Sequence, residues 1–195
     1  KIEFGFNPDE PVVLFLGGSQ GAERMNAFLL ENLSTLTEKF QILHQTGTKN
    51  YETHQNQYLF LTRGKEGTWK NRYKFFPFFH ENLRKAYEAA DLVVSRAGAG
   101  SIFELAALGK PAILVPFPDA ANNHQVQNAY EYEKAGAAVV LEEENFLSGL
   151  VVATIELILG KDEKRASMAE AARKFSIPNS GEIIAEDILR SVLNI

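Results

Sequence analysis

PVVLFLGGSQGA, residues 11–22, joins a run of apolar residues to a glycine-rich turn, and a segment with helical spacing follows it directly. Short apolar runs bounded by turn residues are typical of buried strands, and a three-to-four-residue apolar period indicates a helix. This stretch therefore predicts a strand, a tight turn and a helix, which is the first unit of an alternating α/β fold.

The rest of the chain repeats this alternation. The predicted strands are short and mostly β-branched or aromatic, and they span residues 12–16, 40–44, 73–76, 91–95, 112–115 and 138–141. The predicted helices span 22–36, 81–90, 101–108 and 124–135, followed by three consecutive helices over 145–159, 164–175 and 182–193. Residues 49–71 lack a regular pattern, so we expect an irregular surface segment there. The chain is predicted to form a single α/β, Rossmann-like domain with a six-stranded, mostly parallel sheet, helices on both faces and C-terminal helices.

Composition excludes several classes of function. The net charge is −5 and the 20 Lys and Arg residues are scattered, so nothing indicates a nucleic-acid partner or an anionic membrane surface. The chain has no cysteine, which excludes disulfides and thiolate metal sites. The first residues carry no secretion signal and no apolar run approaches a membrane span, so we expect a cytoplasmic domain without direct membrane insertion.

The glycine turn of residues 17–22 is a candidate phosphate site. Gly17 and Gly18 permit conformations that a Cβ would block, and the helix that follows offers unpaired N–H groups to an anion. Ser19 can donate to a phosphate or can cap the helix. The turn has neither the GxGxxG of dinucleotide-binding folds nor the Gly-Lys-Ser/Thr ending of a P-loop.

A second turn of the same kind, SRAGAGSIFE at residues 95–104, follows the predicted strand 91–95. Two such turns in one parallel sheet can face the same crevice at the carboxyl ends of the strands. Glu104 lies three residues after Ser101, so the pair can form a capping box, or Glu104 can accept hydrogen bonds from a ribose diol. Arg96 can pair with a phosphate or with a carboxylate.

A third polar constellation, DAANNHQ at residues 119–125, leads into a helix that carries Asn128. Amide and imidazole groups at the open end of a sheet can read sugar hydroxyls. The alternative is that Asn122 or Asn123 caps the helix while His124 and Gln125 are solvated.

Several ordered strings give the sequence a family resemblance. They are GGSQGA at 17–22, HQTG at 44–47, SRAGAGSIFE at 95–104, GKPAILVPFP at 109–118, NHQVQNA at 123–129 and EKAGAA at 133–138. Together they resemble the C-terminal half of the MurG family, bacterial glycosyltransferases of the two-domain GT-B fold. These enzymes transfer N-acetylglucosamine (GlcNAc) from UDP-GlcNAc to lipid I, forming lipid II in peptidoglycan synthesis.

The resemblance implies a donor-binding role for ten positions. They are Gly18, Ser19 and Gln20 for the diphosphate, Gly100 and Ser101 for phosphate and sugar, Glu104 for the ribose, His80 for a backbone contact with uracil, and Gln125, with His124 and Asn128 nearby, for the GlcNAc hydroxyls. Ser101 stands where the family more commonly has Thr, and the hydroxyl is kept. His44 ends a predicted strand and is expected to be structural.

The resemblance also implies what this chain does not carry. The N-terminal acceptor domain, with the catalytic base and the binding site for lipid I, is expected outside the chain, so the chain alone is expected to be inactive. The family's inverting transfer needs no cofactor and no essential metal, which agrees with the lack of an Asp-x-Asp motif in the sequence. The full-length enzyme is expected on the cytoplasmic face of the inner membrane.

Two other functions remain open at this stage. The chain can be the catalytic subunit of a split GlcNAc transferase that acts on a polyprenyl-diphosphate sugar, as in the eukaryotic dolichol pathway. It can also be a non-catalytic nucleotide-sugar-binding module. If the glycine turns are only helix caps, no UDP binding is expected at all.

Overall fold

A six-stranded parallel sheet forms the centre of the computed structural model, which describes residues 1–18, 22–118, 123–146 and 148–193. The strands are β1 (Val12–Leu16), β2 (Gln41–Gln45), β3 (Tyr73–Phe76), β4 (Leu92–Ser95), β5 (Ala112–Leu114) and β6 (Ala138–Val140). Their order across the sheet is β3-β2-β1-β4-β5-β6, with every neighbouring pair parallel. This confirms the predicted fold class.

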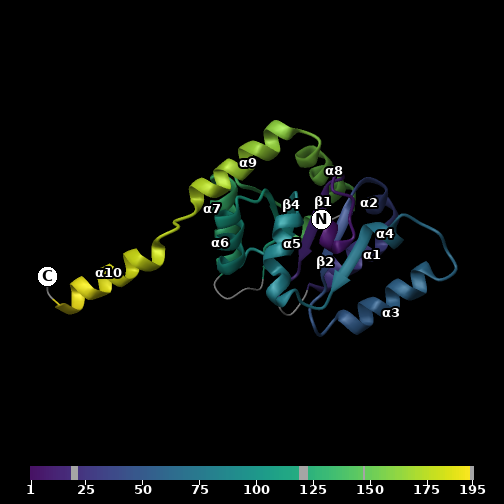
Figure 1. Ribbon diagram of the computed structural model, residues 1–195, viewed down its shortest axis with the longest axis horizontal. Helices are drawn as coiled ribbons and strands as arrows, with labels where there is room; N and C mark the ends of the chain where they lie inside the picture. The colour runs from purple at the N-terminus through teal and green to yellow at the C-terminus, as the bar shows by residue number, and fades with distance from the viewer. Residues whose placement is uncertain (19–21, 119–122, 147, 194–195) are drawn as a thin grey trace.

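Helices cover both faces of the sheet, as Figure 1 shows. They are α1 (Glu23–Glu31), α2 (Leu33–Lys39), α3 (Tyr51–Thr62), α4 (Trp69–Arg72), α5 (Leu83–Ala89), α6 (Ala99–Leu108), α7 (His124–Lys134), α8 (Ser148–Leu159), α9 (Asp162–Phe175) and α10 (Ser180–Leu193), with short 3-10 turns η1 (Ile2–Phe4), η2 (His80–Asn82) and η4 (Glu143–Asn145). None of the described helices is both long and apolar enough to cross a membrane.

The apolar residues of the strands divide between two buried layers. Val13 and Phe15 of β1 pack with α1, α2 and α8, whereas Leu14 and Leu16 pack with α5, α6 and α7. A strand covered on both faces must be apolar at every position, because successive side chains point to opposite sides of the sheet. The uninterrupted apolar run at the start of the quoted stretch is thus explained by a central strand.

Two predicted segments differ from the structure. The helix expected over 22–36 is divided at Asn32, where α1 ends and α2 begins. The segment 49–71 is not irregular, because it contains α3 and α4. In α3 a single residue, His54, is buried, so the segment lacks the apolar stripe by which an amphipathic helix is recognised.

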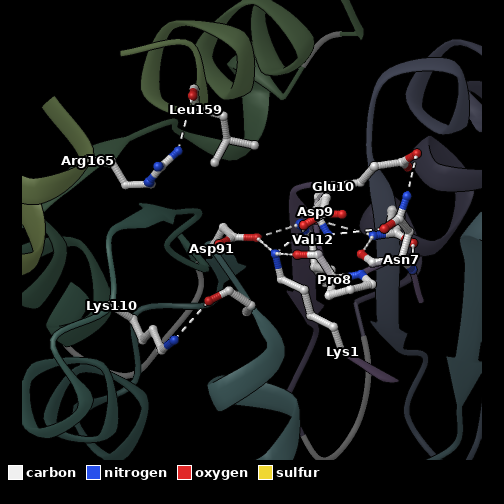
Figure 2. Close-up of polar contacts among 12 residues, drawn as sticks. Lys1, Asn7, Pro8, Asp9, Glu10, Val12, Asp91, Lys110, Leu159 and Arg165 are labelled. Atoms are coloured by element: carbon white, nitrogen blue, oxygen red, sulfur yellow. Dashed lines mark hydrogen bonds and ion pairs between the residues drawn. The ribbon is translucent and has the colours of Figure 1, made fainter. Parts of the chain in front are cut away.

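Ion pairs and hydrogen bonds close the amino ends of the central strands (Figure 2). Lys1 Nζ lies 2.8 Å from Asp91 Oδ2, and that oxygen accepts a hydrogen bond from Val12 N, also at 2.8 Å. Beside it, Lys110 Nζ donates to the carbonyl oxygen of Ala90 at 2.8 Å. These contacts tie together the segments that precede β1, β4 and β5. Ligands of open α/β sheets bind at the opposite, carboxyl ends of the strands.

The last two helices differ in how closely they pack against the rest of the domain. Met168 and Ala172 of α9 are buried, one in each apolar layer. The last helix, α10, projects away from the rest of the chain (yellow in Figure 1), and its apolar side chains Ile183, Ile184, Ile188, Leu189 and Val192 are exposed. The C-terminal helix therefore contributes little to the core.

Candidate functional site

A cleft of about 860 Å³ opens at the carboxyl ends of β1 and β4. From β1 the chain adds β2 and β3 on one side and β4, β5 and β6 on the other, so the strand order reverses between β1 and β4. Open α/β sheets bind ligands at this reversal. The cleft is lined by Gly17, Gly18, Ala22, Glu23, Arg24, Lys49, Asn50, Arg96, Gly98, Ser101, Phe117, Gln125 and Glu143.

The N-termini of three helices meet at this cleft. Ala22 is the N-cap residue of α1 and Gly98 that of α6, and neither residue has a side-chain polar group that could cap its helix. Gln125 is the second residue of α7. The first N–H groups of a helix lack partners within the helix and carry the positive end of its dipole, so the cleft is suited to an anion.

The first turn needs glycine at Gly18. Its φ is +81°, in the left-handed region that L side chains rarely adopt, and an added Cβ would meet no atom of the described residues within 4 Å. Backbone conformation rather than crowding therefore requires glycine here. Ser19 and Gln20, which the sequence places next in this turn, lie outside the described residues.

Arg96 pairs with a carboxylate, one of the two alternatives left open by the sequence, and it also lines the cleft. Its NH2 lies 2.7 Å from Glu143 Oε1, and its guanidinium lies 5.3 Å from the centre of the Phe117 ring. Phe117 N donates to Gln125 Oε1 at 3.1 Å. This bond uses the amide oxygen of Gln125. The amide nitrogen of the side chain can still donate to a ligand oxygen.

The capping-box alternative for Ser101 and Glu104 is wrong. The helix begins at Ala99, two residues earlier than predicted, so Ser101 lies inside the first turn instead of at the N-cap. Glu104 Oε2 instead accepts a hydrogen bond from the hydroxyl of Tyr87 at 2.9 Å. Burial, with a smaller contribution from the Glu104 charge, raises the pKa of Tyr87, so the hydroxyl stays protonated and donates. Glu104 is exposed on α6, away from the lining of the cleft.

The remaining predicted residues lie around the cleft without lining it. Gly100 is exposed in the first turn of α6, and His124 is exposed at the start of α7. Asn128 Nδ2, one turn further along α7, donates to the carbonyl oxygen of Ala97 at 3.3 Å.

Asn123 is the N-cap residue of α7, with φ +55° and no side-chain capping bond. The predicted capping role of its side chain is therefore wrong, and Asn122 lies outside the described residues.

His80 lies apart from these residues, at the start of η2. Its φ is +45°, which is uncommon for a residue with a side chain and costs free energy. Its exposed ring lies edge-on to Phe78, with the ring centres 4.8 Å apart.

Comparison with known proteins identifies the family of this domain. Residues 12–182 match the model of the glycosyltransferase family 28 C-terminal domain. The chain belongs to this family. The match covers the cleft and all six strands, and it confirms the resemblance inferred from the motifs.

The relatives of this family 28 domain are named as GlcNAc transferases. A protein of Anaeromyxobacter sp. (strain Fw109-5), named UDP-N-acetylglucosamine--N-acetylmuramyl-(pentapeptide) pyrophosphoryl-undecaprenol N-acetylglucosamine transferase, is 41% identical over 90% of this chain and 45% of its own length. The crystal structure of Acinetobacter baumannii MurG matches with a TM-score of 0.77 and 30% identity, over 93% of this chain and 52% of that one. The chain thus spans about half the length of the relatives it matches.

A more distant structure shares the fold alone. UDP-GlcNAc 2-epimerase from Neisseria meningitidis, solved with UDP-GlcNAc bound, has a TM-score of 0.65 and 16% identity, over 97% of this chain and 46% of that one. Within the described residues of the family 28 domain, no group of three or more His, Asp or Glu residues is placed to hold a metal ion.

Sequence reasoning missed several residues of the family 28 cleft. Arg24, Lys49 and Asn50 line it, and two of them carry a positive charge that suits an anionic ligand. Lys49 and Asn50 follow HQTG after one residue, Thr48, which was a usable signal, but the pattern gave no reason to place that loop beside the first glycine turn.

A buried polar network lies behind this loop. His44 Nδ1 lies 2.9 Å from the Tyr73 hydroxyl and His44 Nε2 lies 3.0 Å from Asn26 Oδ1. His54 Nε2 also lies 2.6 Å from the Tyr73 hydroxyl. Burial lowers the pKa of His54 to about 4 and, with a smaller effect of His54, holds the pKa of His44 well below its ordinary value. His44 is therefore a structural residue, as its place at a strand end predicted.

Proposed function

We propose that the chain is the donor-binding half of a glycosyltransferase that transfers GlcNAc from UDP-GlcNAc to lipid I, forming lipid II for peptidoglycan, with inversion at the anomeric carbon. The observation that carries the proposal is the cleft between the ends of β1 and β4, bounded by helix N-termini and by Arg24 and Lys49. The names of the full-length relatives supply the substrates.

The diphosphate is proposed to lie on the two glycine turns. The N-termini of α1 and α6 direct N–H groups and positive dipole ends into the cleft, where Gly18 and Ser101 line its wall. Ser19 and Gln20, by their place in the first turn, and Gly100, in the first turn of α6, complete the proposed phosphate contacts.

The uridine is proposed to extend from the cleft past α6 toward η2. Glu104 supports this because its carboxylate is exposed one helical turn beyond Ser101 and is held by the Tyr87 hydroxyl. A carboxylate can accept hydrogen bonds from both hydroxyls of a ribose. The strained backbone of His80 is the proposed contact for uracil, since a fixed backbone can pair with the edge of a base whatever the side chain.

The sugar is proposed to meet the start of α7. Gln125 offers its Nε2 protons because Phe117 N occupies its Oε1, and Asn128 offers its Oδ1 because its Nδ2 donates to Ala97. A donor and an acceptor on successive turns can distinguish hydroxyl positions on a hexose. His124 stands beside them at the first position of the helix.

The role of this chain in the reaction is to bind the donor and stabilise the leaving group. The acceptor hydroxyl attacks the anomeric carbon, the bond from that carbon to the diphosphate oxygen breaks, and UDP leaves with the electron pair. The helix N-termini and the cations of the cleft stabilise the charge that develops on the diphosphate. The base that takes the acceptor proton is proposed to lie in an N-terminal acceptor domain outside this chain, on the cytoplasmic face of the membrane.

The proposal needs no metal ion or other cofactor at the diphosphate. The helix N-termini, Arg24 and Lys49 supply the positive potential that a divalent cation would otherwise provide.

Calorimetric titration of the chain with UDP-GlcNAc, UDP-glucose and GDP-mannose tests the donor assignment. Saturable binding that favours UDP-GlcNAc supports a donor domain. Equal binding of UDP-glucose would remove the sugar from the proposal, and preference for GDP-mannose would contradict the assignment of the nucleotide.

A further inference from the structure

The side chain of Gln45, the last residue of β2, joins two loops that lie on either side of its strand. Its Nε2 donates to the carbonyl oxygen of Gly18 at 3.2 Å, and its Oε1 accepts from Phe79 N at 3.1 Å. The residue is 4% exposed, the bond to Phe79 is buried and the bond to Gly18 is partly buried. One buried amide therefore connects the first glycine turn with the segment that precedes His80.

Both connected loops contain a residue with positive φ. Gly18 has φ +81°, which glycine adopts without strain, whereas His80, next to Phe79, has φ +45° and carries a side chain. The conformation of His80 persists only where surrounding contacts determine it. Gln45 supplies one such contact to each loop, and both loops belong to the proposed donor site.

The end of β2 is rigid enough to act as a support. Thr46 N donates to the carbonyl oxygen of Phe76 at 3.0 Å, and Asn26 Nδ2 donates to the carbonyl oxygen of Thr46 at 3.1 Å. On the other side of Gln45, both ring nitrogens of buried His44 have hydrogen-bond partners. The residues before and after Gln45 are thus fixed to α1 and β3.

A glutamine suits this position chemically. The bond to Gly18 needs a donor and the bond to Phe79 needs an acceptor, and the amide carries both at one end of a side chain. Glutamate can accept from Phe79 but cannot donate to Gly18, and methionine, of similar length, can do neither.

We infer that Gln45 is a positioning residue for the nucleotide, which sets the glycine turn that holds the diphosphate and the His80 segment that meets the base in one fixed relation. The inference rests on the proposed function, because it takes UDP as the ligand. Gln45 does not touch the nucleotide itself. It acts through the backbone of Gly18 and Phe79.

Gln41, at the other end of the same strand, provides a matched control. Its buried amide also joins loops, accepting from Asn7 N at 2.7 Å and donating to the carbonyl oxygen of Asn7 at 2.8 Å, but it does so at the amino end of the sheet. It is 2% exposed. Gln41→Met and Gln45→Met therefore remove buried amides of similar burial, and only Gln45 lies at the proposed site.

The test measures UDP and uridine affinities by calorimetry, and the exchange rate of the Phe79 amide proton by NMR. Gln45→Met is expected to weaken UDP binding about tenfold, because the glycine turn and the Phe79 segment each lose a hydrogen bond that positions them, while Gln41→Met changes it less than about twofold. Gln45→Glu still accepts a hydrogen bond from Phe79 N, so we expect slow exchange of the Phe79 amide proton and an unchanged affinity for uridine. Because it cannot donate to Gly18, we expect it to lose much of the affinity by which UDP exceeds uridine.

The outcomes separate this inference from the proposed function. If the unaltered chain binds neither UDP nor uridine, the proposed function fails, and slow Phe79 exchange that Gln45→Met accelerates still confirms the support of the loop. If the unaltered chain binds UDP and the two Met variants bind it equally well, the positioning role is overturned. Equal weakening in both Met variants would likewise overturn it, because the loss would then reflect stability alone.

Discussion

Glu104 carries the clearest single-residue test of the donor site. Its carboxylate accepts a hydrogen bond from Tyr87 at 2.9 Å and is otherwise exposed on α6. We expect Glu104→Ala to weaken UDP binding by about 1–3 kcal/mol, because a group that accepts from the ribose is lost. Calorimetric titration with UDP measures the change.

Tyr87→Phe is the control for that substitution. It removes the same internal hydrogen bond and keeps the carboxylate, so it should cost stability, about 1 kcal/mol, and leave UDP affinity nearly unchanged. If the two variants weaken UDP binding equally, Glu104 only holds Tyr87 and has no contact with the ribose.

The buried histidines predict a pH dependence of stability. The pKa of His54 is about 4 in the folded chain, against an ordinary value of 6.5, so protonation favours the unfolded chain. The free energy of unfolding is therefore unaffected by the titration of His54 above pH 6.5. It decreases by about 3 kcal/mol as the pH falls from 6.5 toward 4. Urea unfolding at several pH values measures this loss.

His54→Phe isolates that contribution from the carboxylates that titrate in the same range. The variant keeps the ring contact with Phe75, where the ring centres are 5.0 Å apart, and removes the titrating group. We expect it to be less stable than the unaltered chain at pH 7, through loss of the bond to Tyr73, and the difference should shrink as the pH falls. A constant difference from pH 7 to pH 4 would contradict the lowered pKa.

At the scale of the elements, the N-termini of α1 and α6 are expected to replace a divalent cation. Binding of UDP-GlcNAc should therefore be unchanged when EDTA is added, because helix N–H groups and cationic side chains hold the diphosphate. Calorimetry with EDTA and with added Mg²⁺ checks this. A large gain in affinity with Mg²⁺ would show that the helix termini are insufficient.

The last helix gives a test of a different kind. The apolar residues of α10 are exposed, so removal of residues 180–195 should change the free energy of unfolding by less than about 1 kcal/mol. Removal of residues 172–195 is the control, since it also deletes buried Ala172 and the Phe175 ring that lies 5.0 Å from Tyr132. That longer truncation should destabilise the chain by about 2 kcal/mol or more. An equal loss in both truncations would mean that α10 stabilises the domain.

Elements were predictable where burial leaves a pattern in the sequence. All six strands were placed within about a residue. The apolar runs of β1, β4 and β5 are buried at every position, whereas the edge strands β3 and β6 are partly buried and carry aromatic or β-branched residues. Helix starts were less accurate: α6 begins at Ala99 after Gly98, which makes no side-chain capping bond and so leaves no capping signal. Helix α3 was missed because its one buried residue, His54, gives no apolar period.

The site was predictable only in part. Gly18, Ser101 and Gln125 line the cleft as their motifs indicated, whereas Arg24, Lys49 and Gln45 were not identified. Their roles depend on which loops the folded sheet brings together, and a linear pattern does not contain that information. The capping box at Ser101 had the right spacing and the wrong helix start.

At the scale of the whole molecule, the two ends of the sheet have different tasks. At the amino ends, Lys1, Asp91 and Lys110 link the segments before the strands, while the carboxyl ends open into the cleft. The chain spans about half the length of the relatives that it matches, so we expect the proposed transfer to need a further part. The central claim is that the cleft between β1 and β4 binds UDP-GlcNAc.

Titration of the isotopically labelled chain with UDP-GlcNAc, followed by amide NMR, shows which end of the sheet binds the ligand. We expect saturable shifts of the amide signals of Gly18, Gly98, Ser101 and Gln125, with those of Val12 and Lys110 at the opposite end unchanged. Saturable binding that leaves the amide signals of the four cleft residues unchanged, or that shifts those of Val12 and Lys110 instead, would contradict binding in the cleft.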